Sequence, residues 1–373
     1  MKTGKLVVFH AAGQPLTHET VLVPALREGE ILVGNEYATL CRSDLNTYSG
    51  KRVEKAPTIL GHEIVGRIAA LGPGAPSQDV RGAPLRVGDR VTWAIYAADP
   101  ESPQSRRGIP QKAPNLFKYG HERVTPESTL HGGLAEYCVL RRHTPIIRID
   151  APIPTPLLAL INCSVATVAG SLRLAGSVGE ATVVIAGVGM LGVIACAMCR
   201  GAGAERIIAV DVNDDRLATA AQFGADDGVK LVPGGPDLKD ALAARFPGQS
   251  VSVGLDYSGV PDTMEALIGA LGVGGTAVLV GATFPQRALQ LSAEQLIRHL
   301  HTLKGLHNYN TQDLVAAVEF MENNWRRFPF ERLVHDQFDL DAAEAAFQYG
   351  LHSGAHRVGI RIAPSHSDSS PRA

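Results

Sequence analysis

Three residues that lie far apart in the chain have side chains that bind borderline-soft metal ions. Cys41 stands in the segment Cys-Arg-Ser-Asp, His62 in Gly-His-Glu, and Cys163 in Asn-Cys-Ser. Two thiolates and one imidazole suit zinc, and three protein ligands leave a fourth coordination position for water or substrate. Cys41, His62 and Cys163 therefore predict an open, catalytic zinc site.

The distance along the chain constrains how such a site forms. Twenty residues separate Cys41 from His62, which excludes a compact zinc finger and favours two loops that converge on one ion. A single buried Cys or an isolated His is most often structural, so the prediction depends on the combination of these residues with their neighbours.

Polar residues next to these ligands have types suited to proton transfer and to metal support. Ser43 follows Cys41 by two positions, where its hydroxyl can accept the proton of an alcohol and pass it outward. The alternative is an ordinary turn serine. Asp44 and Glu63 adjoin ligands, where carboxylates commonly orient an imidazole or stabilise the charge of a metal. Glu63 is also a candidate for direct ligation.

A second motif, Gly187-x-Gly189-x-x-Gly192, follows an apolar stretch and precedes a second one of helical length. Glycines in this arrangement allow a tight turn and a close approach of the backbone to a pyrophosphate at a helix N-terminus. The amides that would face the pyrophosphate belong to Gly189, Met190 and Leu191. The motif and its context predict a dinucleotide site.

Asp211 ends the next apolar stretch after this glycine motif. A carboxylate in that position accepts hydrogen bonds from the adenosine ribose and repels a 2'-phosphate, which favours NAD over NADP. Asp211 can also cap the helix expected after Asn213, and the two roles are compatible.

The elements that must position these residues fall into two patterns. Up to about Cys163, short strands broken by Gly and Pro predict a β-rich first domain. From about Ala166 to His307, strands alternate with helices, which predicts a doubly wound parallel sheet. The remaining residues look like a return to the first domain, with a frayed end at 364–373.

We expect strands at 31–33, 64–68, 90–93, 135–140, 183–186, 206–211, 251–257, 276–281, 332–338 and 357–362, and helices at 215–223, 261–271, 311–323 and 340–349.

Composition limits the classes of function. A chain of 373 residues favours two domains. Its 35 basic and 37 acidic residues argue against nucleic acid as the main partner. The N-terminus lacks the apolar core of a signal peptide and no apolar run suggests a membrane span, so we expect a cytoplasmic protein. Five dispersed cysteines argue against a disulfide framework. We interpret Cys196 and Cys199 as buried hydrophobic residues.

These residues together resemble the zinc-dependent medium-chain alcohol dehydrogenases over nearly the whole chain. The motifs that carry the resemblance are Cys41-Arg42-Ser43-Asp44, Gly61-His62-Glu63-Ile64-Val65-Gly66, Val87-Gly88-Asp89-Arg90-Val91, Gly132-Gly133-Leu134-Ala135-Glu136-Tyr137 and the glycine turn. The resemblance implies an α/β fold with a GroES-like catalytic domain at 1–164, a Rossmann NAD-binding domain at 165–307 and a carboxy-terminal segment at 308–373 that completes the catalytic domain. It also implies Arg42 and Arg357 as pyrophosphate contacts, and a homodimer or homotetramer.

Two departures from the family pattern change these expectations. Many members carry four cysteines in a structural-zinc lobe, but residues 94–115 contain none, so we predict one catalytic zinc and no structural zinc. Some members end their proton relay in a histidine where this chain has Asn46, and a neutral amide is not an equivalent base. The route of proton exit therefore differs.

A narrower resemblance involves a branch associated with phosphonate metabolism. The segments Cys41-Arg42-Ser43-Asp44-Leu45, Thr47-Tyr48-Ser49-Gly50, Lys118-Tyr119-Gly120-His121-Glu122 and His307-Asn308-Tyr309 carry it. It implies a hydroxyalkyl phosphonate as substrate, with Lys51, Arg52, Lys118 and His121 as candidates to bind the dianion. For each residue alone, solvated surface charge is the simpler interpretation.

The leading hypothesis is a zinc-dependent oxidoreductase that transfers a hydride between a small polar alcohol and NAD, with no nucleic acid or membrane partner. One alternative is a zinc-free reductase of the same superfamily that reduces quinones or enones with NADPH. The presence of Cys41, His62 and Cys163, together with Asp211, argues against it. The other alternative is a nucleotide-binding sensor without catalysis.

Overall fold

The computed structural model describes residues 2–232, 234–282 and 284–362, and they divide into two compact units. Unit 1 comprises Met1–Cys163, Asn310–Val318 and Phe330–Ala373. Unit 2 comprises Ser164–Tyr309 and Glu319–Pro329. The predicted frayed tail at 364–373 lies outside the described residues.

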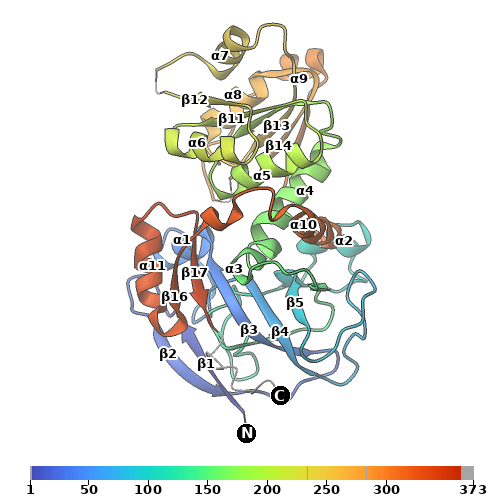
Figure 1. Ribbon diagram of the computed structural model, residues 1–373, viewed down its shortest axis with the longest axis vertical. Coiled ribbons are helices and arrows are strands. Elements are labelled where there is room, and N and C mark those ends of the chain that lie inside the picture. Colours follow the sequence, from blue (N-terminus) through green and yellow to red (C-terminus); the bar gives the residue numbers. More distant parts are fainter. Residues whose placement is uncertain (1, 233, 283, 363–373) are drawn as a thin grey trace, which may run out of the picture. The chain divides into compact units, whose positions relative to one another are not determined.

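Unit 1 is built around a seven-stranded sheet in the order β16-β17-β3-β4-β5-β9, with β8 also paired to β3 (Figure 1). Its strands are β3 (Ile31–Leu40), β4 (Glu63–Leu71), β5 (Arg90–Trp93), β8 (Tyr137–Leu140), β9 (Ile146–Arg148), β16 (Val334–Asp339) and β17 (Arg357–Arg361). All pairs are antiparallel except β16 with β17. Carboxy-terminal strands thus complete the sheet begun near the N-terminus.

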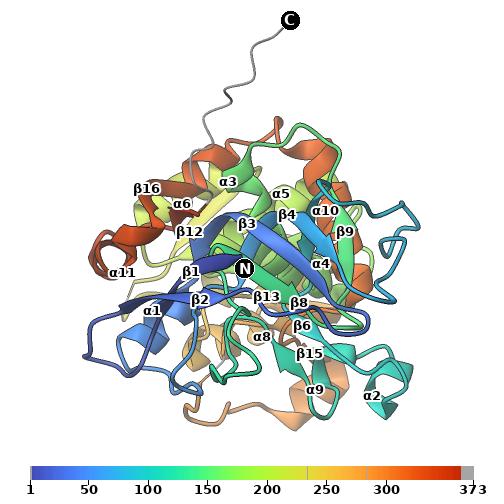
Figure 2. The ribbon, with the colours of Figure 1, turned by 90° about the horizontal axis from the view of Figure 1, so that it is seen from below.

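Smaller elements surround this sheet. Strands β1 (Thr3–Val8) and β2 (Thr17–Leu22) form an antiparallel ribbon, which Figure 2 shows near the N-terminus, and β6 (Tyr96–Ala97) pairs with β7 (Phe117–Lys118). The helical elements are α1 (Arg42–Tyr48), α2 (Pro103–Arg106), a 3-10 turn at Pro110–Lys112, α3 (Thr155–Leu158), 3-10 turns at Phe330–Leu333 and Leu340–Ala342, and α11 (Ala343–His352). Helix α10 (Thr311–Asn324) begins in unit 1.

Alternation along β3 explains why this sheet is covered on both faces. Ile31 and Val33 belong to one hydrophobic cluster, which includes Trp93, whereas Leu32 belongs to another, which includes Phe347 of α11. Successive side chains of a strand point to opposite faces, so β3 contributes to both cores. This central position makes the ends of β3 and β4 rigid supports for functional side chains.

Unit 2 contains a parallel six-stranded sheet in the order β12-β11-β10-β13-β14-β15. Its strands are β10 (Thr182–Ala186), β11 (Arg206–Asp211), β12 (Asp227–Lys230), β13 (Val251–Asp256), β14 (Leu271–Leu279) and β15 (Thr302–Gly305). Its helices are α4 (Ala166–Ala175), α5 (Met190–Gly201), α6 (Asp214–Gln222), α7 (Leu238–Arg245), α8 (Pro261–Gly269) and α9 (Ala293–His299). Every residue of β10 is buried, as expected for a central parallel strand.

The predicted fold class is confirmed: a GroES-like β-rich domain is joined to a Rossmann-like parallel sheet. The strands predicted at 90–93 and 206–211 match β5 and β11 in both bounds. Strands β12 and β15 were not predicted, because each has only four residues and little apolar pattern. Helix α11 begins three residues later than predicted, because Leu340–Ala342 forms a separate 3-10 turn.

One apolar helical run in the described residues has the length of a membrane span. The helical stretch Thr155–Ala175 is long and apolar enough to cross a membrane by length and composition, although most of it is buried inside the protein. A buried helix in a protein core passes the same test, because its surroundings are as apolar as lipid.

Candidate metal centre and dinucleotide turn

The predicted zinc ligands come from segments that the unit 1 sheet brings together. Cys41 directly follows β3, and His62 directly precedes β4. Thr39 pairs with Glu63 in the antiparallel register, so the end of β3 and the start of β4 are adjacent. Cys163 lies in a π-helical turn, Ile161–Val165. Two strand ends and one helical turn therefore converge.

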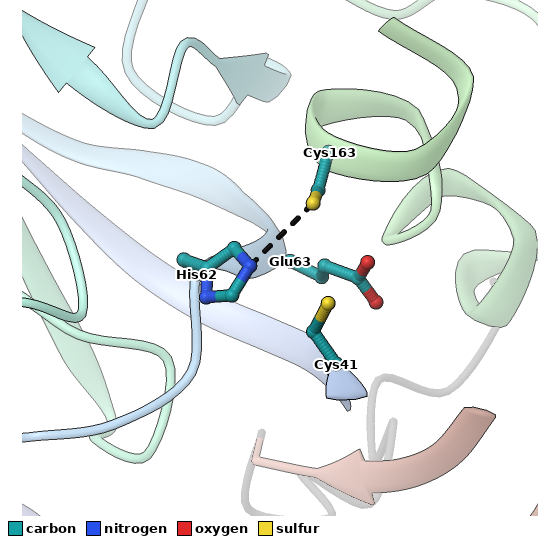
Figure 3. A group of neighbouring side chains, drawn as sticks. All are labelled: Cys41, His62, Glu63 and Cys163. Atoms are coloured by element: carbon teal, nitrogen blue, oxygen red, sulfur yellow. Dashed lines mark hydrogen bonds between the residues drawn. The ribbon is translucent and has the colours of Figure 1, made fainter. Parts of the chain in front are cut away.

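The potential ligand atoms form one tight group. The ligating atoms of Cys41, His62, Glu63 and Cys163 all lie within 4.8 Å of one another, and Figure 3 shows the four side chains pointing toward a common point. Cys163 Sγ lies 3.5 Å from His62 Nε2. His62 and Glu63 are buried, whereas both cysteines are partly exposed. The group is therefore buried on the side of His62 and Glu63 and partly exposed on the side of the two cysteines.

The electrostatics of this group suit a cation. A hydrogen bond from Cys163 and the charges of Arg357 and His62 lower the pKa of Cys41, against the effect of burial. Burial opposes protonation of His62, but Asp44 and Cys41 raise its pKa to about 10. A proton on His62 therefore balances a Cys41 thiolate. Metal binding requires the thiolate and displaces the proton, so these donors fit a zinc ion.

Asp44 connects the two ligand-bearing loops. Its Oδ2 accepts a hydrogen bond from the backbone N–H of Cys41 at 2.9 Å, and its Oδ1 accepts one from Gly61 at 3.1 Å. The same Oδ1 lies 3.3 Å from His62 Nδ1. Asp44 is buried. It therefore holds the ring of His62 with Nε2 directed at the sulfurs, which is the support expected behind a metal-binding imidazole.

Glu63 is held by a buried ion pair. Arg357 donates from Nε to Glu63 Oε2 at 2.6 Å and from Nη2 to Oε1 at 2.8 Å, while Thr39 Oγ1 donates to Oε2 at 2.5 Å. Arg357 Nη2 also lies 3.5 Å from Cys41 Sγ. Burial raises the pKa of Glu63, and the charge of Arg357 opposes this change. Arg357 thus supports the metal group directly, and its expected contact with a pyrophosphate stays a prediction.

The short helix α1 carries the remaining predicted residues of this region. Ser43 is partly exposed, and Arg42 is exposed on the same helix. Asn46 is partly exposed and accepts a hydrogen bond on its carbonyl from the backbone N–H of Arg52 at 3.0 Å. The proton-transfer role of Ser43 and the cofactor contact of Arg42 stay predictions.

Asn162 was missed from the sequence although it adjoins a ligand. Its buried side chain accepts from the backbone N–H of Ile64 at 3.2 Å and donates to the carbonyls of His62 at 3.0 Å and Trp93 at 3.1 Å. These bonds attach the turn of Cys163 to the segment of His62. The signal that identifies it is an amide side chain beside a predicted ligand, in an otherwise apolar stretch.

In unit 2, the glycine motif lies between the end of β10 and the start of α5. Gly187 has φ +85°, and a Cβ there would lie 2.5 Å from the backbone nitrogen of Ser258. A Cβ on Gly192 would lie 2.2 Å from the carbonyl oxygen of Gly187. A Cβ on Gly189 would meet open space. The turn is therefore closely packed at Gly187 and Gly192 and has free space at Gly189. Gly189 directly precedes Met190 and Leu191, which begin α5.

Asp211 lies at the carboxyl end of β11, beside this turn. Its Oδ2 accepts from the backbone N–H of Val188 at 2.9 Å, and its Oδ1 accepts from Val212 at 2.8 Å and Asn213 at 3.1 Å. Asn213, not Asp211, caps α6 through its side chain. Asp211 therefore attaches the glycine turn to the neighbouring strand. A ribose contact stays a prediction, as do the pyrophosphate contacts of the turn.

Cys196 and Cys199 lie on α5 of unit 2. Both are buried, and burial raises the pKa of each thiol. Such thiols are not reactive and pack as small apolar residues.

Two family models match the chain. One, described as the alcohol dehydrogenase GroES-like domain, matches residues 27–151, and the other, described as zinc-binding dehydrogenase, matches residues 190–323. The first match contains Cys41, His62 and Glu63, and the second contains Asp211. Cys163, Gly187 and Gly189 lie outside both matches.

Among curated relatives, an L-threonine 3-dehydrogenase of Edwardsiella ictaluri is 28% identical over 291 residues, which cover 77% of this chain and 79% of that protein. The same enzyme of Shewanella frigidimarina is 29% identical over 273 residues, covering 72% and 74%. An alcohol dehydrogenase of Thermotoga maritima has a similar structure, with TM-score 0.89, 24% identity, and coverage of 97% of this chain and 100% of that chain. The last likeness concerns the fold alone.

Proposed function

Because the chain belongs to the zinc-binding alcohol dehydrogenase family, we propose that it uses one catalytic zinc ion and NAD to oxidise a small polar alcohol. It is a zinc-binding oxidoreductase of the alcohol and threonine dehydrogenase type. The proposed reaction converts an alcohol and NAD⁺ to an aldehyde or ketone, NADH and a proton. The carbon loses its hydride to the nicotinamide, and its hydroxyl proton leaves to solvent.

The observation that carries this proposal is the convergence of Cys41, His62, Glu63 and Cys163 within 4.8 Å. Within residues 2–232, 234–282 and 284–362, no other group of three or more His, Cys, Asp or Glu side chains could hold a metal ion in this way. A zinc ion held there supplies a Lewis acid that lowers the pKa of an alcohol and polarises a carbonyl. Two partly exposed cysteines leave one side of the group open to a small ligand.

The remaining groups of the site have separate tasks in the proposed reaction. Cys41, His62 and Cys163 hold the metal, and Asp44 keeps the imidazole of His62 in orientation. Ser43, partly exposed on α1, accepts the proton of the alcohol hydroxyl. The charge of Arg357 balances Glu63, so a carboxylate can remain next to two thiolates without repelling them from the site.

NAD is the proposed dinucleotide because a carboxylate stands beside the glycine turn. The pyrophosphate would lie at the N-terminus of α5, where unpaired backbone amides and the helix dipole favour negative charge. Asp211 would accept from the ribose and repel a 2'-phosphate. Its Oδ2 accepts a single described hydrogen bond and retains a lone pair for a ribose hydroxyl.

The substrate class and the cellular setting extend the proposal. The proposed substrates are small polar alcohols, such as a polyol, a hydroxyalkyl phosphonate or, as in the relatives' names, L-threonine. We also propose a homodimer or homotetramer, located in the cytoplasm, without a nucleic acid or membrane partner.

The test combines metal content and turnover. The protein is purified without added metal, and its zinc content per subunit is measured. Turnover is then measured with NAD and with NADP on polyols, hydroxyalkyl phosphonates and L-threonine, before and after chelation and after restoring zinc. We expect one zinc per subunit, activity that follows zinc, and preference for NAD.

Other outcomes select the alternatives. Metal-free protein that reduces quinones or enones with NADPH would establish the zinc-free reductase. Metal-free protein that binds a dinucleotide with no turnover of any substrate would favour the sensor. A Cys163→Ala variant that retained zinc and full turnover would overturn the ligand assignment.

A further inference from the structure

A loop that carries Lys118 and His121 packs directly against the segment of His62. Gly120 has φ +76°, and a Cβ there would lie 2.6 Å from the carbonyl oxygen of Gly61 and 3.2 Å from His62 Cβ. The ring centroids of His121 and His62 are 5.0 Å apart. The close approach at Gly120 therefore holds residues 118–121 beside the metal-binding group.

The acidic residues near this loop already have cationic or imidazole partners. Glu54 forms an ion pair with Arg52, and its Oε1 lies 3.1 Å from Nδ1 of His121. Burial opposes ionisation of Glu54, but His121, Arg52 and, at longer range, Lys118 lower its pKa. Glu54 thus balances Arg52, and neither leaves a free charge.

Glu122 is engaged in the same way. Its Oε2 accepts from Lys55 Nζ at 2.6 Å, and its Oε1 accepts from the backbone N–H of Lys118 at 3.3 Å. The contact between Glu122 and Lys118 thus involves the backbone of Lys118. The charge of Glu122 is balanced by the ammonium of Lys55, which is exposed.

Lys118 differs from Arg52 and Lys55 because, among the described residues, its ammonium forms no direct ion pair. Its side chain is half-buried, and within the described parts of the chain its ammonium has no hydrogen-bond or ion-pair partner. Burial and the charges of Arg52 and Lys112 lower the pKa of Lys118, while Glu54 and Cys163 act in the opposite direction, and Glu54 is already engaged with Arg52 and His121. A partly desolvated ammonium without an anion is costly, and a bound anion would relieve that cost.

We propose that Lys118 binds an anionic group of the alcohol substrate, so that the enzyme selects alcohols that carry a carboxylate or a phosphonate. This inference rests on the proposed dehydrogenase function and specifies its substrate class. A carboxylate and a phosphonate share the same recognition chemistry, a negative oxygen that accepts from an ammonium. A neutral alcohol would leave Lys118 unpaired in a half-buried position, and this difference provides the selectivity. Lys51 is fully exposed, which suits solvation.

The experiment compares alcohols of similar size that differ in charge. Zinc-loaded enzyme with saturating NAD is assayed on 3-hydroxypropanoate, 2-hydroxyethylphosphonate and neutral 1,3-propanediol. In Lys118→Met we expect kcat/KM for the preferred anion to fall at least about tenfold, mainly through KM, with about twofold or less change for the diol. Lys118→Arg should restore most of the loss because it restores the charge. The matched control is Lys55→Met, which removes an exposed cation already paired with Glu122 and should change the anion's KM little.

A binding measurement separates failure of this inference from failure of the dehydrogenase function. Propanoate and ethylphosphonate, which lack the reacting hydroxyl, are titrated into the zinc-loaded wild type and Lys118→Met by calorimetry. Binding that disappears in Lys118→Met supports the anion site, even if no alcohol is oxidised and the dehydrogenase function fails. Oxidation of 1,3-propanediol with no preference for either anion overturns the anion site and leaves the dehydrogenase function intact. An equal loss of kcat/KM for charged and neutral alcohols in Lys118→Met also overturns the anion site. If the losses differ between the two anions, the anion with the larger loss of kcat/KM identifies the charged group of the substrate.

Discussion

The metal-binding group in unit 1 and the glycine turn in unit 2 are built by opposite means. The first joins side chains from positions 41, 62, 63 and 163, and its interior holds buried charges. The second uses a contiguous turn, 187–192, whose working parts are backbone amides at a helix N-terminus. A site for a cation requires anionic side chains brought from a distance, whereas a site for a pyrophosphate can be made locally.

This difference also determines how each site is supported. Around the metal group, Asp44, Asn162 and Arg357 connect loops that are distant in sequence through side-chain hydrogen bonds. Around the glycine turn, close packing of backbone against backbone at Gly187 and Gly192 is the main constraint. Substitutions should therefore affect the two sites separately, since each site lies within its own unit.

The largest expected effect is on the metal group. Cys163→Ala should abolish zinc retention and turnover. This loss is larger than the about 10- to 100-fold fall in metal affinity or activity that follows removal of a residue hydrogen-bonded to a metal ligand. The affinity for NAD, which depends on unit 2, should remain within about twofold. Zinc content and NAD titration check both expectations. Cys138→Ala is the matched control, because it removes a buried thiol of β8 outside the group, and it should retain zinc.

The converse variant tests the glycine turn. The Cβ of Gly192→Ala would overlap the carbonyl of Gly187, so the turn must shift. A distortion that costs about 2–3 kcal/mol weakens NAD binding roughly 100-fold. Zinc content should not change. The control is Gly269→Ala, at the end of α8, where a Cβ meets nothing within 4 Å. Loss of zinc in Gly192→Ala would contradict the independence of the two sites.

Removing the side chain that connects the ligand loops should have an intermediate effect. Asp44→Ala leaves the backbone amides of Cys41 and Gly61 without their acceptor and His62 without its support. We expect zinc affinity to fall about 10- to 100-fold, measured by competition with a chelator. Asp79→Ala is a matched control, since Asp79 is a buried acceptor for the loop amides of Arg81 and Ala83. Similar zinc loss in both variants would indicate general destabilisation instead.

The smallest expected effect concerns the choice of dinucleotide. Asp211→Ala removes a charge near the proposed ribose site, and the ratio of kcat/KM for NAD to that for NADP should fall about tenfold, equivalent to ~1.4 kcal/mol. Part of the fall in kcat/KM with NAD comes from loosening of the glycine turn, because Asp211 also accepts a hydrogen bond from the backbone N–H of Val188. Asp215→Ala, which removes an exposed carboxylate of α6, should leave the ratio unchanged. An unchanged ratio in Asp211→Ala would exclude its role in selection.

The two units differ in how clearly their sequences indicate their strands. The alternation of strand and helix predicted β10, β11, β13 and β14, because parallel strands buried on both faces are continuous apolar runs. The short polar strands β12 and β15 carry no such signal. In unit 1, the motif residues identified candidate ligands. Of their partners, Asn162 is marked only by its place beside Cys163 in an apolar stretch, and Thr39 occupies a strand position that has no distinctive pattern.

Residue types and motif spacing thus determined the two-part α/β architecture, the donor set for a metal and the position of the dinucleotide turn, because each depends on local chemistry or local periodicity. Only the tertiary structure decided that Arg357 pairs with Glu63, that Asp44 joins two loops, and that the Lys118 ammonium forms no ion pair with any described residue. These facts depend on which segments the sheet of unit 1 brings together. Strand pairing between distant residues determines that arrangement, and a linear sequence does not specify it directly.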